Sequence, residues 1–407
     1  MMNEQIITSL LDNDLYKFNM GQCLLHQYAD ASVVWQYKNR DAADRRFTAE
    51  MVDEIKEQVQ AFCKLCFTPD ELEYLSNACP WLSSDYISFL SIYHPQLNWF
   101  DIRLDDDDQL YLTITGPQFL TTYCETPVMS IISETWFKME LAPDAYESAK
   151  AELYRRTDEK IEKLISGEWA IGGFSDFGTR RRFSKETFDV IIKKFTEARD
   201  SFKGSNFVGT SNVEYAKKYN IRPIGTIAHE LIQTIGQGYP ERNPAYSNKF
   251  VMDAWHQEYG TENGTYLTDC IGTDVFLKDF DKINAKLFDG VRHDSGDPYE
   301  WGEKILGHYK SLGIDAHEKT LLFSDSLNFE KAHSIRRAFA DRARVAFGIG
   351  TYIVADTNVR YMNQVIKVVE VNGRPVAKLS DVAGKNMCRD PKYIDYLQRA
   401  IKWRMEH

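Results

Sequence analysis

The second half of the chain repeats one unit, a short apolar segment of strand type followed in most cases by a helical pattern. Seven such segments occur, in the order AIGGFSD, NFVGTS, RPIGTIA, TYLTDCIG, DGVRHDS, TLLFSDS and RVAFGIG. This alternation predicts parallel strands joined by right-handed crossovers. Polar residues end nearly every segment, which favours a barrel over an open sheet with a single crevice. Because a closed barrel needs one strand more, we expect an α/β fold with an irregular, incomplete (β/α) barrel of about seven strands.

Two of the intervening helices carry clear end signals. Ser184 precedes an apolar stripe within residues 188–198, the spacing of an amphipathic helix. A second helix is predicted to begin with Asp297 as its N-cap and Pro298 in its first turn, and to end at Gly313. Both patterns fit helices that cover the outside of the barrel.

The repeating unit covers only part of the chain, which we divide into three parts. Residues 1–135 mix helical and strand patterns and form an N-terminal α+β domain without obvious chemistry. A long polar helix over residues 143–165 leads into the catalytic barrel domain, residues 136–360. Residues 361–407 are predicted to complete the N-terminal domain by packing on it.

Composition excludes several classes of function. Among 407 residues, 49 Lys and Arg stand against 60 Asp and Glu, a formal net charge of −11. An acidic surface argues against binding to nucleic acid or to an anionic membrane. No apolar run is long enough for a membrane span, and the start of the chain lacks the pattern of a signal peptide. Seven cysteines without regular spacing suit reduced thiols, so we expect a cytoplasmic protein.

Residues 10–28 have the pattern of a capped helix, with Asp12 or Asn13 as the N-cap. Pattern alone makes Tyr16 a packed aromatic residue of that helix. Residues 31–41 alternate between apolar and polar side chains, as in a β-strand.

Two further motifs have structural interpretations. Cys63 and Cys66 form a CxxC pair, but they lie on an apparent amphipathic helix with no second pair, so core packing is favoured over a metal site. The acidic run 105–108 lies between two alternating segments, which favours a solvated hairpin turn over a cation site.

Several motifs, taken together and in order, resemble those of nicotinate phosphoribosyltransferases of the shorter bacterial type. They are SDFGTRRRFS (175–184), FVGTSNVEYAKKYNIRPIGTIAHE (207–230), DGVRHDSGDPYEWGEK (289–304), LLFSDSLN (321–328) and FGIGTYI (347–353). The resemblance extends from the N-terminal DNDLYKFNM to the C-terminal VNGRPVAKLSDVAGKNMCRD. It implies transfer of a phosphoribosyl group from 5-phosphoribosyl 1-pyrophosphate to nicotinate, coupled to ATP hydrolysis through a transient phosphohistidine, in salvage synthesis of NAD.

The resemblance implies a site for the pyridine ring and its carboxylate. Phe177 matches the ring-stacking residue and Arg180 the substrate-contacting arginine, whose planar fork suits a carboxylate or a phosphate. Cations are disfavoured at a helix start, so the Arg180–Arg182 triplet favours a functional role. Tyr16 matches an aromatic residue that reaches the pyridine site from a neighbouring subunit, which predicts a homodimer with shared active sites.

His229 matches the phosphorylated histidine, and imidazole is a suitable nucleophile near neutral pH. His293 is a weaker candidate, because alternation along its strand points it away from its neighbours. Those neighbours, Arg292 and Asp294, match a substrate-binding arginine and a ribose-binding carboxylate.

The 5-phosphate requires backbone donors after the last strand. Candidates there and nearby are Gly348, Gly350, Thr351, Ser324 and Asp325, with a further anion-facing turn at Gly209, Thr210 and Ser211. Mg²⁺ is implied as a cofactor held through the pyrophosphate, which requires no protein metal cage.

Three alternatives stay open. A nicotinamide phosphoribosyltransferase would have the same arrangement of site residues and would recognise an amide in place of the carboxylate. An aldolase or isomerase would need a catalytic lysine or glutamate at a strand end, and none of the seven strand ends offers a lysine. A non-catalytic phosphoribosyl sensor should lack the phosphorylatable histidine, yet His229 is present.

Overall fold

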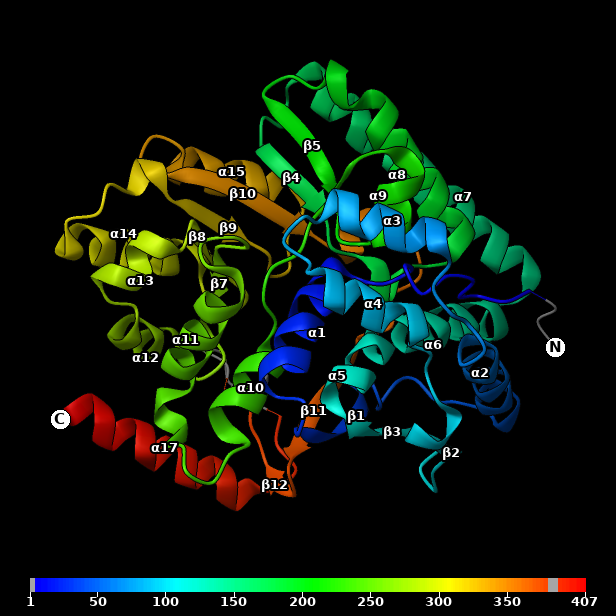
Figure 1. Cartoon of the computed structure of the whole chain (residues 1–407). Coiled ribbons are helices and arrows are strands. Elements are labelled where there is room, and N and C mark those ends of the chain that lie inside the picture. Colours follow the sequence, from blue (N-terminus) through cyan, green and yellow to red (C-terminus); the bar gives the residue numbers. More distant parts are fainter. Residues whose placement is uncertain (1–3, 380–386) are drawn as a thin grey trace.

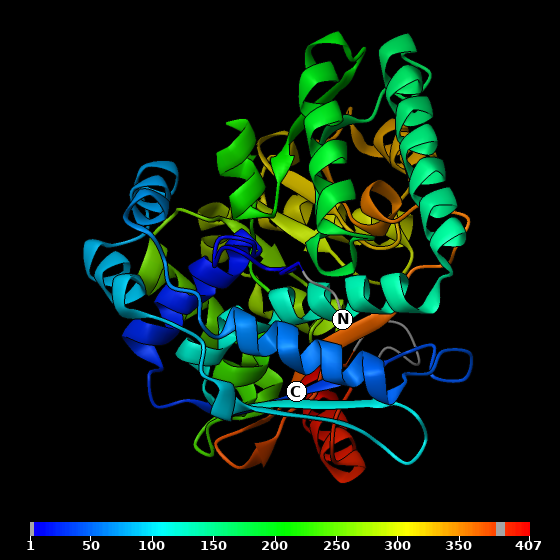
Figure 2. The ribbon, with the colours of Figure 1, turned by 90° about the vertical axis from the view of Figure 1, so that its right-hand side faces the viewer.

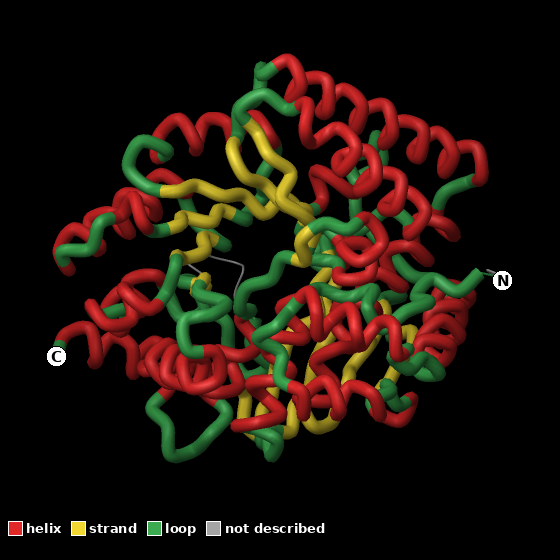
Figure 3. Tube along the Cα trace, turned by 45° about the horizontal axis from the view of Figure 1, so that its top comes forward, coloured by secondary structure: helices red, strands yellow, loops and turns green. Residues whose placement is uncertain are grey.

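A computed structural model describes residues 4–379 and 387–407 of the chain. Its strands form two separate sheets (Figure 3). One sheet has seven parallel strands in the order β6-β5-β4-β10-β9-β8-β7, and the other has five antiparallel strands in the order β12-β11-β1-β3-β2. The predicted α/β fold with an incomplete seven-stranded barrel is therefore confirmed.

The seven barrel strands correspond to the seven predicted segments. They are β4 (Gly172–Asp176), β5 (Ser205–Thr210), β6 (Arg222–Pro223), β7 (Thr265–Leu267), β8 (Gly290–His293), β9 (Thr320–Phe323) and β10 (Arg344–Ile349). The first and last of these strands in the sequence are neighbours in the middle of the sheet, because β10 pairs with β4. β6 and β7 are its two unpaired edges, and the chain between them forms α10 (His229–Gln237) and α11 (Ser247–Tyr259).

Helices cover the outer face of the barrel. α7 (Pro143–Ser166) and α8 (Lys185–Ala198) lie side by side there (Figure 2). Ser184 caps α8, and Asp297 caps α14 (Pro298–Leu312), as predicted. The remaining barrel-domain helices are α9 (Val213–Tyr219), α12 (Thr273–Asp279), α13 (Lys282–Leu287), α15 (Phe329–Phe339) and α16 (Thr351–Val354).

The antiparallel sheet combines both ends of the chain. β1 (Ser32–Asn39) lies between β3 (Leu110–Pro117) and β11 (Gln364–Val371), with β2 (Phe100–Leu104) and β12 (Arg374–Pro375) at the edges. The acidic run 105–108 is the turn between β2 and β3, as predicted. Helices α2 (Ala49–Phe62), α3 (Pro69–Ala78), α4 (Ser84–Ile92), α5 (Gln118–Thr121) and α6 (Glu125–Glu140) complete the N-terminal part.

The last helix corrects one expectation about the C-terminal segment. β11 and β12 join the N-terminal sheet, but α17 (Pro391–Glu406) packs on the barrel domain. Arg404 of α17 is buried and donates a hydrogen bond to Asp279 of α12 at 2.9 Å. The prediction that all of 361–407 packs on the N-terminal domain is therefore wrong for this helix. Part of the C-terminal motif, residues 380–386, lies outside the described residues.

The first helix is shorter than predicted. α1 (Leu15–Gln27) begins after Asp14, and neither Asp12 nor Asn13 caps it. Residues 11–15 are instead bonded to residues 211–214, with Val213 N–H donating to Asn13 O at 2.9 Å. α1 and α10 lie between the barrel strands and β11 (Figure 1). The N-terminal segment therefore reaches the C-terminal end of β5, where the chain continues into the candidate site.

The CxxC pair does not lie on a helix. α2 ends at Phe62, so Cys63 and Cys66 lie in the connection to α3. All seven cysteines are free, in agreement with the prediction of reduced thiols. None of the helices in the described part of the chain has the length and apolar character needed to cross a membrane.

Candidate active site

A pocket of about 330 Å³ lies at the C-terminal ends of the barrel strands, between the barrel and the N-terminal sheet. Strands β4, β5, β8, β9 and β10 end at this pocket, and α1, β1 and β11 contribute from the other side. Most residues predicted from the sequence line it, namely Tyr16, Phe177, Arg180, Ser211, His229, Arg292, Asp294, Ser324, Asp325, Gly350 and Thr351. Parallel strands explain this convergence, because all their carboxyl ends meet at one edge.

Tyr16 and Phe177 bring two aromatic rings to the pocket. Tyr16 belongs to α1 and lines the pocket of its own chain. Its position therefore gives no support to the prediction that this residue reaches a neighbouring subunit. Phe177 follows β4, and its backbone N–H donates to Ile349 O at 2.9 Å.

Three predicted phosphate contacts have structural roles instead. A Cβ atom on Gly348 would lie 2.3 Å from the Phe177 ring, so this glycine makes room for the ring. A Cβ atom on Gly209 would lie 1.9 Å from Arg222 O, where β5 meets β6. Thr210 is buried and donates to Asp176 Oδ2 at 2.7 Å. The other phosphate candidates predicted from the sequence line the pocket, namely Ser211, Ser324, Asp325, Gly350 and Thr351.

We expect Gly348→Ala to lower the free energy of unfolding by about 1–3 kcal/mol, the usual cost of overpacking. The new methyl group must displace the Phe177 ring. Gly307→Ala is the matched control, because Gly307 lies within α14 and a Cβ atom there meets nothing within 4 Å. That change should stabilise the protein by up to about 1 kcal/mol. Urea denaturation of both variants measures the two effects, and equal effects would contradict the crowding at Gly348.

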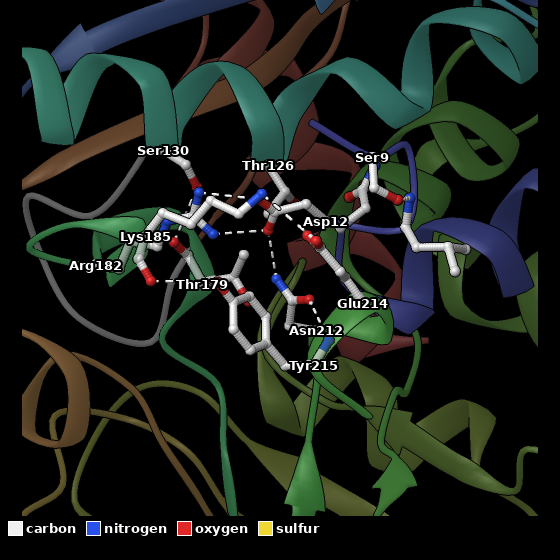
Figure 4. A network of polar contacts seen from close by, with 12 residues as sticks. Ser9, Asp12, Thr126, Ser130, Thr179, Arg182, Lys185, Asn212, Glu214 and Tyr215 are labelled. Atoms are coloured by element: carbon white, nitrogen blue, oxygen red, sulfur yellow. Dashed lines mark hydrogen bonds and ion pairs between the residues drawn. The ribbon is translucent and has the colours of Figure 1, made fainter. Parts of the chain in front are cut away.

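The three arginines of the triplet lie in two different environments. Arg180 and Arg181 both line the pocket, and Arg181 Nη2 donates to Gln364 O at 3.1 Å. Arg182 is fully buried away from it and donates to both oxygens of Asp12, at 2.7 and 2.9 Å, and to Glu134 at 2.6 Å. Figure 4 shows Arg182 and Asn212 both directed at Asp12. The functional interpretation of the whole triplet was therefore wrong for Arg182, which fastens the N-terminal segment to the barrel.

His229 begins α10 at the pocket wall. Its Nε2 lies 2.8 Å from Asp269 Oδ1, and the second oxygen of Asp269 accepts a hydrogen bond from Ser295 at 2.6 Å and lies 3.1 Å from the Lys378 ammonium. Burial lowers the pKa of His229 to about 4, and Lys378 acts in the same direction. The imidazole is therefore neutral at pH 7. With its Nε2–H directed at Asp269, its Nδ1 carries the free lone pair.

The ligand atoms of His229, Asp269 and Asp294 lie within 4.8 Å of one another, a spacing that could hold a metal ion. However, the Lys378 ammonium lies 3.1 Å from Asp269 and 3.8 Å from Asp294. A fixed cation between these carboxylates opposes a second one. The cluster therefore fits a histidine held by a carboxylate better than a metal centre.

Asp294, Arg292 and Ser324 form the floor of the pocket. Ser324 Oγ lies 3.1 Å from Asp294 Oδ1, and Arg292 Nη1 donates to Thr226 at 2.6 Å. Burial acts to raise the pKa of Asp294, but Arg292 and Lys378 hold it below its usual value. Asp294 is therefore an anion at neutral pH. His293 lies on the other side of β8, against Trp301 and Phe323, which confirms that it points away from Arg292 and Asp294.

Sequence reasoning missed seven charged residues of the site. Six line the pocket, namely Asp14, Arg40, Glu125, Glu230, Lys367 and Lys378, and Asp269 lies behind His229. Asp269 follows the predicted strand TYLTDCIG, so its place at a strand end was an available signal. Lys367 lies within the run VIKVV of the segment NQVIKVVEV, between apolar neighbours, and a lysine in such a run is also a recognisable signal. Arg40 and Glu125 carried no local signal.

The strand ends of the half-barrel, with α1, β1 and β11, surround arginine and lysine side chains, a neutral histidine and four aromatic rings. Such a pocket defines an α/β enzyme site for an anionic substrate with an aromatic part. Sequence profiles identify the family. The nicotinate phosphoribosyltransferase (NAPRTase) N-terminal domain matches residues 11–133, and the NAPRTase family matches residues 173–404. The chain belongs to the nicotinate phosphoribosyltransferase family, which confirms the resemblance noted in its sequence.

Relatives with this name are similar in sequence over nearly the whole chain. A nicotinate phosphoribosyltransferase of Ralstonia nicotianae is 40% identical over 398 residues, covering 97% of this chain and 99% of that protein. Nicotinate phosphoribosyltransferase 1 of Pseudomonas aeruginosa is 40% identical over 399 residues, covering 98% and 97%. The crystal structure of the Porphyromonas gingivalis enzyme has a TM-score of 0.89 at 32% identity, covering 98% and 100%. That of a putative enzyme of Saccharomyces cerevisiae has a TM-score of 0.90 at 33% identity, covering 99% and 100%.

Proposed function

We propose that this protein is an ATP-coupled nicotinate phosphoribosyltransferase. Nicotinate, 5-phosphoribosyl 1-pyrophosphate, ATP and water would give nicotinate mononucleotide, pyrophosphate, ADP and phosphate, a step of NAD salvage. The observation that carries the proposal is the meeting, in one pocket, of an aromatic pair, Arg180, Asp294 and a neutral His229. Family membership and the names of the relatives support the same reaction.

His229 is the proposed phosphoryl acceptor. Its Nδ1 lone pair would form a bond to the γ-phosphorus of ATP, and the bond from that phosphorus to the bridging oxygen would break and release ADP. Asp269 would keep the proton on Nε2 and stabilise the cation that develops on the ring. Water would later cleave the P–N bond, which returns the neutral imidazole and releases phosphate.

The phosphoribosyl step requires groups that stabilise the negative charge that develops on the departing pyrophosphate. The bond from the ribose C1 to pyrophosphate breaks as the bond from C1 to the pyridine nitrogen forms. Asp294 and Ser324 are the proposed partners of the ribose hydroxyls, and Gly350 and Thr351 those of the 5-phosphate. The arginines at the pocket would stabilise the departing negative charge.

Mg²⁺ is a proposed cofactor. It would be held mainly through the pyrophosphate, with Asp325 and Ser324 as hard oxygen donors that line the pocket. When bound, Mg²⁺ neutralises negative charge on the pyrophosphate and so stabilises it as the leaving group.

The homodimer and the cytoplasmic location stay predictions. Tyr16, Phe177 and Arg180 line one pocket within a single chain, so association of two copies is not needed to bring them together. The seven free thiols suit a reducing compartment.

Product formation from nicotinate, and separately from nicotinamide, tests the function. We expect nicotinate mononucleotide from nicotinate, 5-phosphoribosyl 1-pyrophosphate and Mg²⁺, at a rate that ATP increases, with ADP formed alongside. Liquid chromatography of the nucleotide products measures both. Turnover of nicotinamide in preference would assign the amide-specific reaction, and turnover of neither would contradict a catalytic role.

A further inference from the structure

A buried group of charges lies beside Tyr16 on the N-terminal side of the pocket. Lys17 is fully buried and lies 2.5 Å from Glu125 Oε2, and it also pairs with Glu230. Arg180 Nη1 and Lys367 Nζ both approach the other oxygen of Glu125, at 3.8 and 3.9 Å. We call these five residues the Glu125 cluster. They come from α1, α6, α10, β11 and the turn after β4.

The Glu125 cluster has an excess of one positive charge, since three cations face two carboxylates. Burial raises the pKa of Glu230, a change that can only increase this excess. Asp14, which accepts hydrogen bonds from Ser211 and Thr126, and Asp294 also act on Arg180. The cations Arg40 and Arg181 lie beside Arg180 as well and offset these two carboxylates. An unbalanced buried charge is costly, so the cluster favours a ligand that brings one negative charge.

Lys367 and Arg180 are the two cations of the cluster that are free to meet such a ligand. Both line the pocket, and their side chains are 19% and 35% exposed, whereas Lys17 is 0% exposed. Their distances to Glu125 are too long for hydrogen bonds. Within the described residues, neither side chain has a hydrogen bond that would occupy its N–H groups. Both can therefore donate to the same incoming oxygens.

We propose that Lys367 is a specificity-determining residue which, with Arg180, binds the carboxylate of nicotinate and so selects the acid over the amide. This inference rests on the proposed function. A neutral amide would leave the positive excess of the cluster uncompensated, whereas a carboxylate balances it. Two charge-assisted hydrogen bonds to one carboxylate also give orientation, which would direct the pyridine nitrogen away from β11 and toward the ribose site.

The main test is Lys367→Met, which keeps a long unbranched side chain and removes its charge. We expect the KM for nicotinate to rise about 10- to 100-fold, as for loss of one partner of a partly buried charge pair. The kcat and the KM for 5-phosphoribosyl 1-pyrophosphate should stay within about twofold. The preference for nicotinate over nicotinamide, as a ratio of kcat/KM values, should fall by the same factor. Lys367→Arg should restore most of the preference, because it retains the cation.

A pH profile separates this role from a structural one. Burial lowers the pKa of Lys367 to about 8, while Glu125 acts in the opposite direction. Arg180, Lys378 and Lys17 also face it and lower the pKa further. Lys367 is thus charged below about pH 8 and loses its proton above it. In the unmodified protein, the KM for nicotinate should rise as the pH passes about 8, and Lys367→Arg should remove that rise.

Lys38→Met is the matched control, because Lys38 lies exposed on the neighbouring strand β1 and does not line the pocket. It should change none of these values. An unchanged nicotinate KM in Lys367→Met, or a rise confined to the KM for 5-phosphoribosyl 1-pyrophosphate, would overturn the inference and leave the proposed function intact. Failure of the unmodified protein to use nicotinate would instead remove the proposed function itself. Circular dichroism of each variant verifies that it is folded.

Discussion

His229→Ala should take up no phosphate from γ-labelled ATP, whereas the unmodified protein becomes labelled. The reason is the geometry of the His229–Asp269 pair, which leaves one neutral ring nitrogen with a free lone pair at the pocket wall. Formation of nicotinate mononucleotide should persist slowly in this variant and should no longer respond to ATP. Labelling of the denatured protein, with the loss of label in acid that marks a P–N bond, measures the first effect.

Two further variants sharpen this test. His317→Ala removes an exposed histidine outside the pocket and should leave labelling unchanged. Asp269→Asn keeps the shape of the partner and removes its charge, so we expect the rate of labelling to fall by between about 10²- and 10⁴-fold. Undiminished labelling of His229→Ala would identify a different phosphoryl acceptor.

Arg182→Met should lower the free energy of unfolding by about 3–5 kcal/mol, the usual cost of removing one partner from a buried ion pair. Arg182 is fully buried between Asp12 and Glu134. Its loss would remove the ion pair of Glu134 and leave Asp12 with the more distant Lys185 ammonium, at 4.0 Å. Activity should also fall, because Asp12 precedes Asp14 and Tyr16, which line the pocket. Urea denaturation followed by tryptophan fluorescence measures the stability.

Arg155→Met is the control for this change. Arg155 lies on α7 and pairs with Glu152 and Glu159 in solvent, and its side chain is 55% exposed. An exposed ion pair contributes at most about 1 kcal/mol. The loss in the free energy of unfolding should therefore be several-fold larger for Arg182→Met than for Arg155→Met. If Arg182→Met cost no more than Arg155→Met, the buried pair would not fasten the N-terminal segment.

Local patterns predicted the barrel strands and most of the pocket. Each strand is a short apolar run that ends in polar residues, and the carboxyl ends of parallel strands meet at one edge. For this reason Arg292, near the end of β8, and Asp294 and Ser324, which follow β8 and β9, line the pocket. The same reasoning excluded His293, since alternate residues of a strand face opposite sides.

The errors came from residues whose role depends on a distant part of the chain. Arg182 has the same type and setting as Arg180, and only its contact with Asp12, 170 positions away, makes it structural. The first helix was predicted too long because Asp12 and Asn13 are good caps in isolation, yet both have partners across the fold. Gly348 was assigned to a phosphate because a ring 171 positions earlier in the chain could not be seen beside it.

The sequence by itself determined the strand-helix repeat, the family, and the residue types that meet at the strand ends, because these are local properties and short motifs. Only the tertiary structure decided the charge balance of the site. β11 pairs with β1, from which more than half of the chain separates it, and this pairing brings Lys367 close to Glu125 and Arg180. Lys378, which comes after β11, lies beside Asp269. Contacts of this kind depend on long-range strand pairing, for which no residue carries a local signal.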